Sequence, residues 1–164
     1  MDRKSPHKIP LFTGLKQEKS AVIWFVILIL ALAPMFPVSN FVGHPHWDRI
    51  HWIPFQNFSL TWNKLIDVIG NTLWFMVFGY LLHYQLNGNS HSRWTIATIT
   101  AIAGGVSLSA ELFQVFCHSR YPSMTDVACN VMGAGLGAYM STKWPYEKCY
   151  GAVNGYFVNR SGFS

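Results

Sequence analysis

Four apolar runs, at about residues 21–38, 63–86, 94–117 and 124–142, restrict what this sequence can fold into. A run of about 20 apolar residues crosses a hydrocarbon core about 30 Å thick when it forms an α-helix. Only 12% of the residues are charged, about half the usual fraction in a soluble domain. Loops between the last three runs are short, so these runs should pack as antiparallel neighbours. The sequence therefore predicts an all-α fold, a four-helix transmembrane bundle.

The first apolar run could also belong to a secretory signal peptide. Basic residues precede it, and Ala31-Leu32-Ala33 near its end resembles a cleavage site. Cleavage there would leave Pro34 as the first mature residue, which suits a signal peptidase poorly. We therefore expect a retained membrane anchor.

Lys and Arg residues are distributed unequally between the two sides of the predicted bundle. With the N-terminus inside, nine of the 12 fall on the inner side, and Arg49, Lys64 and Arg120 fall on the outer side. Because basic loops remain cytoplasmic, the bias predicts two cytoplasmic tails, residues 1–20 and 143–164. Residues 21–142 would form the membrane domain, with a long outer loop between its first two spans.

Three acidic residues fall inside the predicted spans or at their edges. A charge at the bilayer centre costs about 2.5–3.5 kcal/mol on insertion scales, so such residues usually face the interior of a bundle. Each belongs to a polar stripe whose members are three or four residues apart and so share one helix face. The stripes are Asp67 and Asn71 on the second span, Ser107, Glu111, Gln114 and His118 on the third, and Asp126, Asn130, Gly133 and Gly137 on the fourth.

The three stripes reach a common depth. Counted from the outer helix ends, Asn71, Glu111 and Asn130 lie about 10–12 Å below the outer boundary. Arg120, in the loop between the last two spans, is the nearest cation and could pair with a carboxylate or a phosphate. We therefore expect one polar cavity open to the outer leaflet. Its candidate ligand-binding residues are Asp67, Asn71, Glu111, Gln114, Arg120, Asp126 and Asn130.

Several of these residues also have a purely structural interpretation. Ser123 and Asp126 fit the first and last positions of a capping box at the start of the fourth helix. Asn71, Gln114 and Asn130 could form interhelical hydrogen bonds, which contribute about 0.6 kcal/mol each in membranes. Both interpretations stay open at the level of the sequence.

A small-residue face runs along the fourth span at Gly133 and Gly137. Such a face lets another helix approach closely. Gly104 and Gly105 of the third span offer a matching flat surface, and a helix of another protein could use the same face.

Metal and cofactor sites are not indicated. His44, His46 and His51 lie in the outer loop, but their spacing is not a recognised chelating pattern. The three cysteines lack C-x-x-C spacing, and motifs for nucleophiles, phosphate loops or zinc hydrolases are absent from the sequence. The basic N-terminal tail favours anionic lipid over nucleic acid.

A set of these residues, in this order and spacing, resembles the VanZ-like family of membrane proteins over roughly residues 20 to 142. The set comprises Ile53-Pro54-Phe55, Asp67 to Asn71, Phe75, Gly79, Glu111-Leu112-Phe113-Gln114, Arg120, Asp126-Val127, Asn130 and Gly133 to Gly137. The resemblance implies a multi-pass protein of the bacterial inner membrane. It places the family's polar signature at Asn71, Glu111, Gln114, Arg120, Asp126 and Asn130. The family is named for a member that raises resistance to teicoplanin, so a link to glycopeptide resistance is a further implication.

Three classes of function remain open. The first hypothesis is a binding protein whose outer cavity holds a lipid headgroup or a lipid-linked envelope intermediate. The second is an enzyme acting on such a lipid, with Glu111 or Asp126 as general base and Arg120 stabilising an oxyanion. The third is a helper subunit whose glycine face docks a partner.

Overall fold

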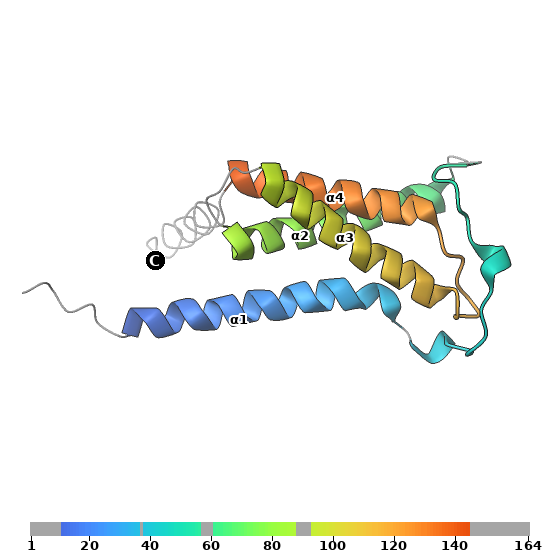
Figure 1. Ribbon diagram of the computed structural model, residues 1–164, viewed down its shortest axis with the longest axis horizontal. Coiled ribbons are helices and arrows are strands. Elements are labelled where there is room, and N and C mark those ends of the chain that lie inside the picture. The colour runs from blue at the N-terminus through green and yellow to red at the C-terminus, as the bar shows by residue number, and fades with distance from the viewer. Residues whose placement is uncertain (1–10, 37, 57–60, 88–92, 145–164) are drawn as a thin grey trace, which may run out of the picture.

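The computed structural model describes residues 11–36, 38–56, 61–87 and 93–144. Within these ranges the chain forms four α-helices and no strand, as Figure 1 shows. The helices are α1 (Leu11–Leu32), α2 (Trp62–Asn87), α3 (Arg93–Gln114) and α4 (Met124–Lys143). Short 3-10 turns follow α1 at Ala33–Met35 (η1), Val38–Asn40 (η2) and Trp47–Arg49 (η3). The all-α prediction with four helices is therefore confirmed.

Two of the helices are long and apolar enough to cross a membrane, over Trp62–Leu86 and Arg93–Gln114. A shorter apolar segment, Ser20–Met35, comprises the last part of α1 and the turn η1. That α1 and α4 also cross the membrane stays a prediction. Most of the two predicted tails, residues 1–10 and 145–164, lies outside the described residues.

The first helix differs from the predicted span at both ends. It begins at Leu11, before the apolar run, because the segment leading to that run includes Leu, Lys, Gln and Glu, which are good helix formers. It ends at Leu32 rather than near residue 38. Pro34 lies in the first turn of η1, where its missing N–H leaves no α-helical hydrogen bond unmade.

The third helix ends at Gln114, three residues before the predicted end of its span. Backbone N–H groups of the outer loop bind the carbonyl groups of the residues that would have continued the helix. The N–H of Val42 donates to the Phe116 carbonyl and the N–H of His46 donates to the Val115 carbonyl, both at 2.9 Å. Phe41 also forms an isolated antiparallel bridge with Cys117.

The outer loop is therefore tied to the bundle along most of its described length. Its later part is bonded to the start of α4. The N–H of His51 donates to the Pro122 carbonyl at 2.9 Å, and the N–H of Met124 donates to the His51 carbonyl at 3.0 Å. Two of its histidines pack against each other: the rings of His44 and His46 lie 4.7 Å apart, edge to face. Among the described residues, no group of three or more His, Cys, Asp or Glu is placed to hold a metal ion.

The most extensive helix contact joins α2 and α4, which run side by side in Figure 1. Glycines make this approach possible. A Cβ built at Gly133 or Gly137 would lie closer than 3.0 Å to the backbone carbonyl of Thr72 or Met76 on α2. Gly79 of α2 is placed in the same way against Ala134. The helix that occupies the glycine face is thus α2 of the same chain.

The contact of α3 with α4 uses the predicted flat surface only in part. A Cβ at Gly104 would touch the Val131 side chain of α4 at 3.3 Å, whereas Gly105 faces open space. The predicted contact between the third and fourth spans is therefore confirmed, but Gly133 and Gly137 turn toward α2 and not toward Gly104 and Gly105.

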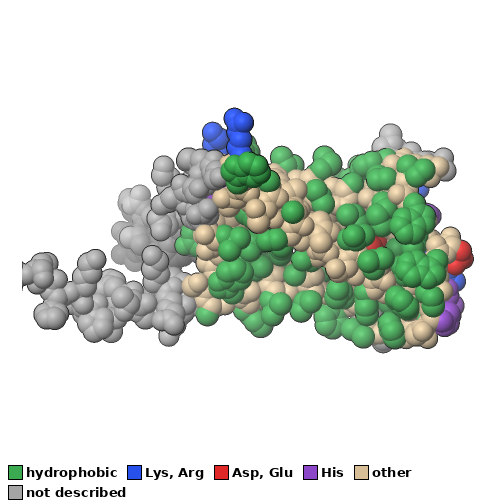
Figure 2. Space-filling model, viewed as in Figure 1, with side chains coloured by type: hydrophobic (Ala, Val, Ile, Leu, Met, Phe, Trp, Pro, Cys, Tyr) green, Lys and Arg blue, Asp and Glu red, His purple; other side chains and the backbone are tan. Residues whose placement is uncertain are grey.

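Apolar side chains cover much of the outside of the described helices. Figure 2 shows them along the length of the body, whereas the Lys, Arg, Asp, Glu and His side chains visible in that view gather toward its ends. Exposed examples include Val22, Phe25, Leu73, Met132 and Leu136. The inside holds a smaller cluster around Phe75, Phe78, Ile99, Ala134 and Ala138. An apolar exterior of this extent is expected for helices packed in lipid.

Candidate functional site

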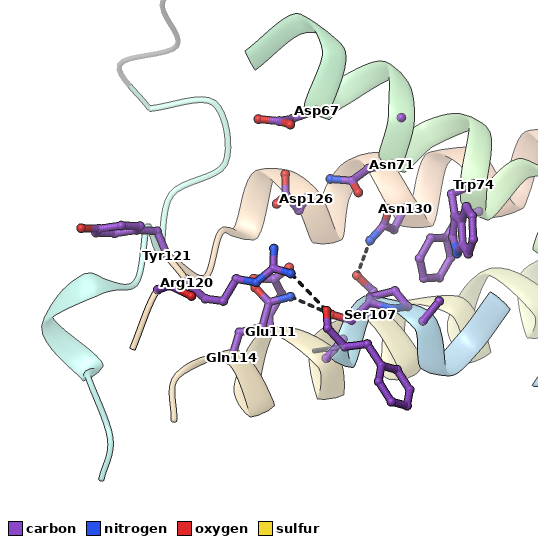
Figure 3. Close-up of a pocket in the computed structure, with 17 residues that line it drawn as sticks. Asp67, Asn71, Trp74, Ser107, Glu111, Gln114, Arg120, Tyr121, Asp126 and Asn130 are labelled. Atoms are coloured by element: carbon purple, nitrogen blue, oxygen red, sulfur yellow. Dashed lines mark hydrogen bonds between the residues drawn. The ribbon is translucent and has the colours of Figure 1, made fainter. Parts of the chain in front are cut away.

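A pocket of about 560 Å³ lies at the end of the bundle where α2 begins and α3 ends. That volume is within the usual range for small-molecule sites. All four helices or the segments beside them contribute to its wall, and Figure 3 shows their polar side chains turned inward. Every residue of the predicted cavity lines it: Asp67, Asn71, Glu111, Gln114, Arg120, Asp126 and Asn130.

Helical spacing explains how α2 and α4 supply their residues. Asp67 and Asn71 are four residues apart on α2, and Asp126 and Asn130 are four apart on α4, so each pair projects from one face. The glycine contact brings these two faces together. As a result the Asn71 side chain lies beside the carboxyl group of Asp126, as Figure 3 shows.

Glu111 joins α3 to the start of α4. Its Oε2 atom accepts the backbone N–H of Ser123 at 2.8 Å. Ser123 is the N-cap of α4, and its hydroxyl accepts the N–H of Thr125 at 3.2 Å. In a capping box the Ser123 N–H would be bound by the side chain three residues later, which is Asp126. Here Glu111 binds it instead, so Asp126 is turned toward the pocket and Asn71.

Asn130 forms the buried floor of the pocket. Its Nδ2 donates to the hydroxyl of Ser107 on α3 at 2.8 Å, a bond drawn in Figure 3. Only 5% of Asn130 is exposed, and its Oδ1 atom has no hydrogen-bond partner. The predicted interhelical hydrogen bond of Asn130 therefore uses one half of its amide and leaves the other half open.

Arg120 and Gln114 connect the pocket to the end of α1. Arg120 Nη2 donates to the Phe36 carbonyl at 3.2 Å, and Gln114 Nε2 donates to the Pro34 carbonyl at 3.3 Å. The hydrogen-bond partner of Arg120 within the protein is thus a backbone oxygen; of the two partners considered from the sequence, a carboxylate or a phosphate, the hydrogen bond uses neither. The two side chains fix the segment after α1 beside the pocket.

Trp74 and the segment after α1 also line the pocket, and they were not predicted from the sequence. Trp74 Nε1 donates to the Leu30 carbonyl at 2.9 Å and so joins α2 to α1. Trp74 follows Asn71 by three residues and shares its helix face, so the spacing could have indicated it. Nothing in the spacing indicates Pro34 and Phe36, because their place depends on how α1 packs.

These features define a class of protein: within the described residues, an all-helical bundle with a largely apolar exterior and a polar pocket at one end. Residues 20–144, most of the chain, match the family model VanZ/LLP1, and the chain belongs to this family. No curated protein and no solved structure matches the chain.

Proposed function

We propose that this protein spans the bacterial cytoplasmic membrane with both termini inside, and that its pocket binds a lipid headgroup or a lipid-linked envelope intermediate from the outer leaflet. One observation carries the proposal: polar residues from α2, α3, α4 and the loop before α4, three of them carboxyl groups, meet in one pocket of a body whose described exterior is largely apolar. Ionisable groups are expensive in a membrane, and their concentration at one point is typical of a functional site.

The surroundings of the pocket suit a position at the membrane boundary. Trp47, Trp52 and Trp62 lie at the same end of the bundle as the pocket, and each is more than half exposed. Tryptophan is enriched where a membrane meets water. This end would therefore lie at the headgroup level, with the cation-rich tails on the opposite side.

The wall of the pocket is amphipathic in a way that matches a lipid. Phe36 is 60% exposed and Tyr121 is 64% exposed, and both line the pocket together with Trp74. Polar groups lie further in, on α3 and α4. An amphiphile could place its headgroup among the polar groups while its chains follow the apolar surface outside.

Catalysis by Glu111 receives no support from its contacts. The Ser123 N–H occupies one of its carboxylate oxygens and gives the residue a structural part in starting α4. We therefore propose binding rather than chemistry as the function of the pocket.

Native mass spectrometry of the full chain, extracted in mild detergent, tests this proposal. We expect a phospholipid or lipid-linked molecule to stay bound and Arg120→Ala to release it. Arg49→Ala is the matched control, because Arg49 binds the His118 carbonyl outside the pocket. A lipid retained equally by the wild type, Arg120→Ala and Glu111→Gln, all normally folded, would contradict the proposal.

The same variants address resistance. If the bound molecule takes part in envelope assembly, cells expressing the wild type should differ from cells expressing Arg120→Ala in their susceptibility to teicoplanin. Equal susceptibility at equal protein abundance would separate this chain from the activity that gave the family its name.

A further inference from the structure

The charges of the pocket are unbalanced. Its wall holds three carboxyl groups, Asp67, Glu111 and Asp126, against one guanidinium, Arg120. Glu111 has a partner in the Ser123 N–H, and Arg120 is directed to the Phe36 carbonyl. Figure 3 shows Asp67, Asn71 and Asp126 around a common space on the side of α2 and α4. That side of the pocket is therefore rich in hydrogen-bond acceptors and in negative charge.

A second observation points to the same requirement. Asn130 lines the pocket, and its Oδ1 atom is buried. No donor among the described residues forms a hydrogen bond with this atom. Buried polar atoms in folded proteins are almost always paired, and leaving one unpaired has a substantial free-energy cost. An unpaired acceptor in the wall, on the same face of α4 as the Asp126 carboxyl group, is accounted for by a ligand that brings N–H or O–H donors.

We propose that the pocket recognises the protonated primary amine of a phospholipid headgroup, as in phosphatidylethanolamine. This inference rests on the proposed function and names its ligand class. The ammonium group has three N–H donors and one positive charge. It can therefore donate to acceptors of the wall, and its charge offsets that of the Asp67 and Asp126 carboxyl groups.

The remaining part of such a headgroup also has a counterpart in the pocket. A phosphate carries negative charge and follows the amine after two carbon atoms. Arg120 and Gln114 lie beside Glu111 on the α1 side of the pocket, away from Asp67. Arg120 is the lining cation and suits a phosphate oxygen. A zwitterionic headgroup thus fits the separation of charge in the wall, whereas a headgroup that is only anionic fits one side of it.

The methylation state of the amine gives a sharp test. Phosphatidylcholine has the same charges as phosphatidylethanolamine but no N–H donor, and phosphatidylglycerol has hydroxyl donors but no positive charge. The purified full chain is incubated with an equimolar mixture of the three lipids with identical acyl chains, and bound lipid is counted by native mass spectrometry. We expect phosphatidylethanolamine to be bound about tenfold more than either competitor, as the loss of one charge-assisted hydrogen bond implies.

Variants locate the preference within the pocket. Asp126→Asn and Asp67→Asn keep the shape of the side chain and remove its charge, and each should reduce the preference for phosphatidylethanolamine several-fold. Asp48→Asn is the matched control, since Asp48 belongs to η3 and does not line the pocket. Circular dichroism establishes that each variant is folded. Asp67 is an exposed residue near the start of α2, so its variant should fold even if Asp126→Asn does not.

Each outcome decides between the two proposals. Equal binding of the three lipids, with or without the variants, would overturn the amine assignment and leave lipid binding intact. A preference for phosphatidylglycerol would show that hydroxyl donors suffice, and it would overturn the assignment as well. Retention of no lipid at all would overturn the proposed function together with this inference.

Discussion

Gly137 lies where α4 is pressed against α2, and this contact holds the two carboxyl-bearing faces of the pocket together. A methyl group added at Gly137 would lie closer than 3.0 Å to the carbonyl of Met76. Because the obstacle is backbone and cannot turn away, α2 must move as a whole. We therefore predict that Gly137→Ala destabilises the protein and disturbs the pocket.

The magnitude follows from two opposing effects. Overpacking of a tight contact costs about 1–3 kcal/mol. Replacing glycine by alanine inside a helix returns up to about 1 kcal/mol, because alanine loses less backbone entropy on folding. The net expectation for Gly137→Ala is a loss of up to about 2 kcal/mol.

Gly105 provides a control with the same chemical change. It lies inside α3, and a Cβ there meets nothing within 4 Å. Gly105→Ala should therefore be neutral or should stabilise the protein by up to about 1 kcal/mol. The assay is thermal unfolding of the two variants in detergent, with size-exclusion chromatography to measure the folded fraction after each heating step. A midpoint for Gly137→Ala equal to or above that of Gly105→Ala would refute the glycine contact between α2 and α4.

Three further predictions concern single contacts around the pocket and the outer loop. Trp74→Phe removes the donor to the Leu30 carbonyl; it should cost about 0.5–1.5 kcal/mol and speed hydrogen exchange at the end of α1, and unchanged exchange would contradict this. Glu111→Ala leaves the Ser123 N–H without its acceptor and should lower stability by about 1–3 kcal/mol, whereas Glu111→Gln keeps an acceptor and should stay near the wild type in thermal unfolding. Desolvation lowers the pKa of His46, so its neutral imidazole stabilises the outer loop fully above about pH 6.5, and this stabilisation is lost as the pH falls through the lowered pKa. Hydrogen exchange of residues 41–51 should therefore become faster on acidification, and His46→Gln should remove that pH dependence.

The sequence was sufficient to predict most of the polar residues that line the pocket. Helical periodicity places Asp67 with Asn71 and Asp126 with Asn130, whatever the packing of the helices. The cost of ionisable groups in lipid turns each pair inward. Residue type and spacing thus determined most of the polar wall before any tertiary contact was known.

Tertiary contacts determined what the sequence could not. The spacing of Gly133 and Gly137 predicts a close helix contact but does not say which helix makes it, and the structure shows α2 rather than α3. Likewise, the capping-box pattern assigns the Ser123 N–H to Asp126, and only the packing of α3 brings Glu111 close enough to replace it. Local patterns give the type of interaction, and the identity of a distant partner depends on the assembled bundle.

The outer loop shows the same limit. The apolar runs and the charge bias predicted a long outer loop, but its backbone pairing with residues 115–118 could not be predicted from composition. The N–H of His118 donates to the Asn40 carbonyl at 3.0 Å, which adds to the bonds that end α3 early. A hydrogen-bonding loop of this kind has no periodic signal, because its contacts depend on a few backbone groups.

Photo-crosslinking in native membranes tests the central claim most directly, that the pocket holds a lipid headgroup from the outer leaflet. A photoreactive phenylalanine replaces Phe36 on the pocket wall or Trp94 at the other end of the bundle, which is 83% exposed. The account predicts that the Phe36 position captures lipids of one headgroup class, enriched over the surrounding membrane, whereas the Trp94 position captures the bulk mixture. Capture of the same bulk mixture at both positions would contradict it.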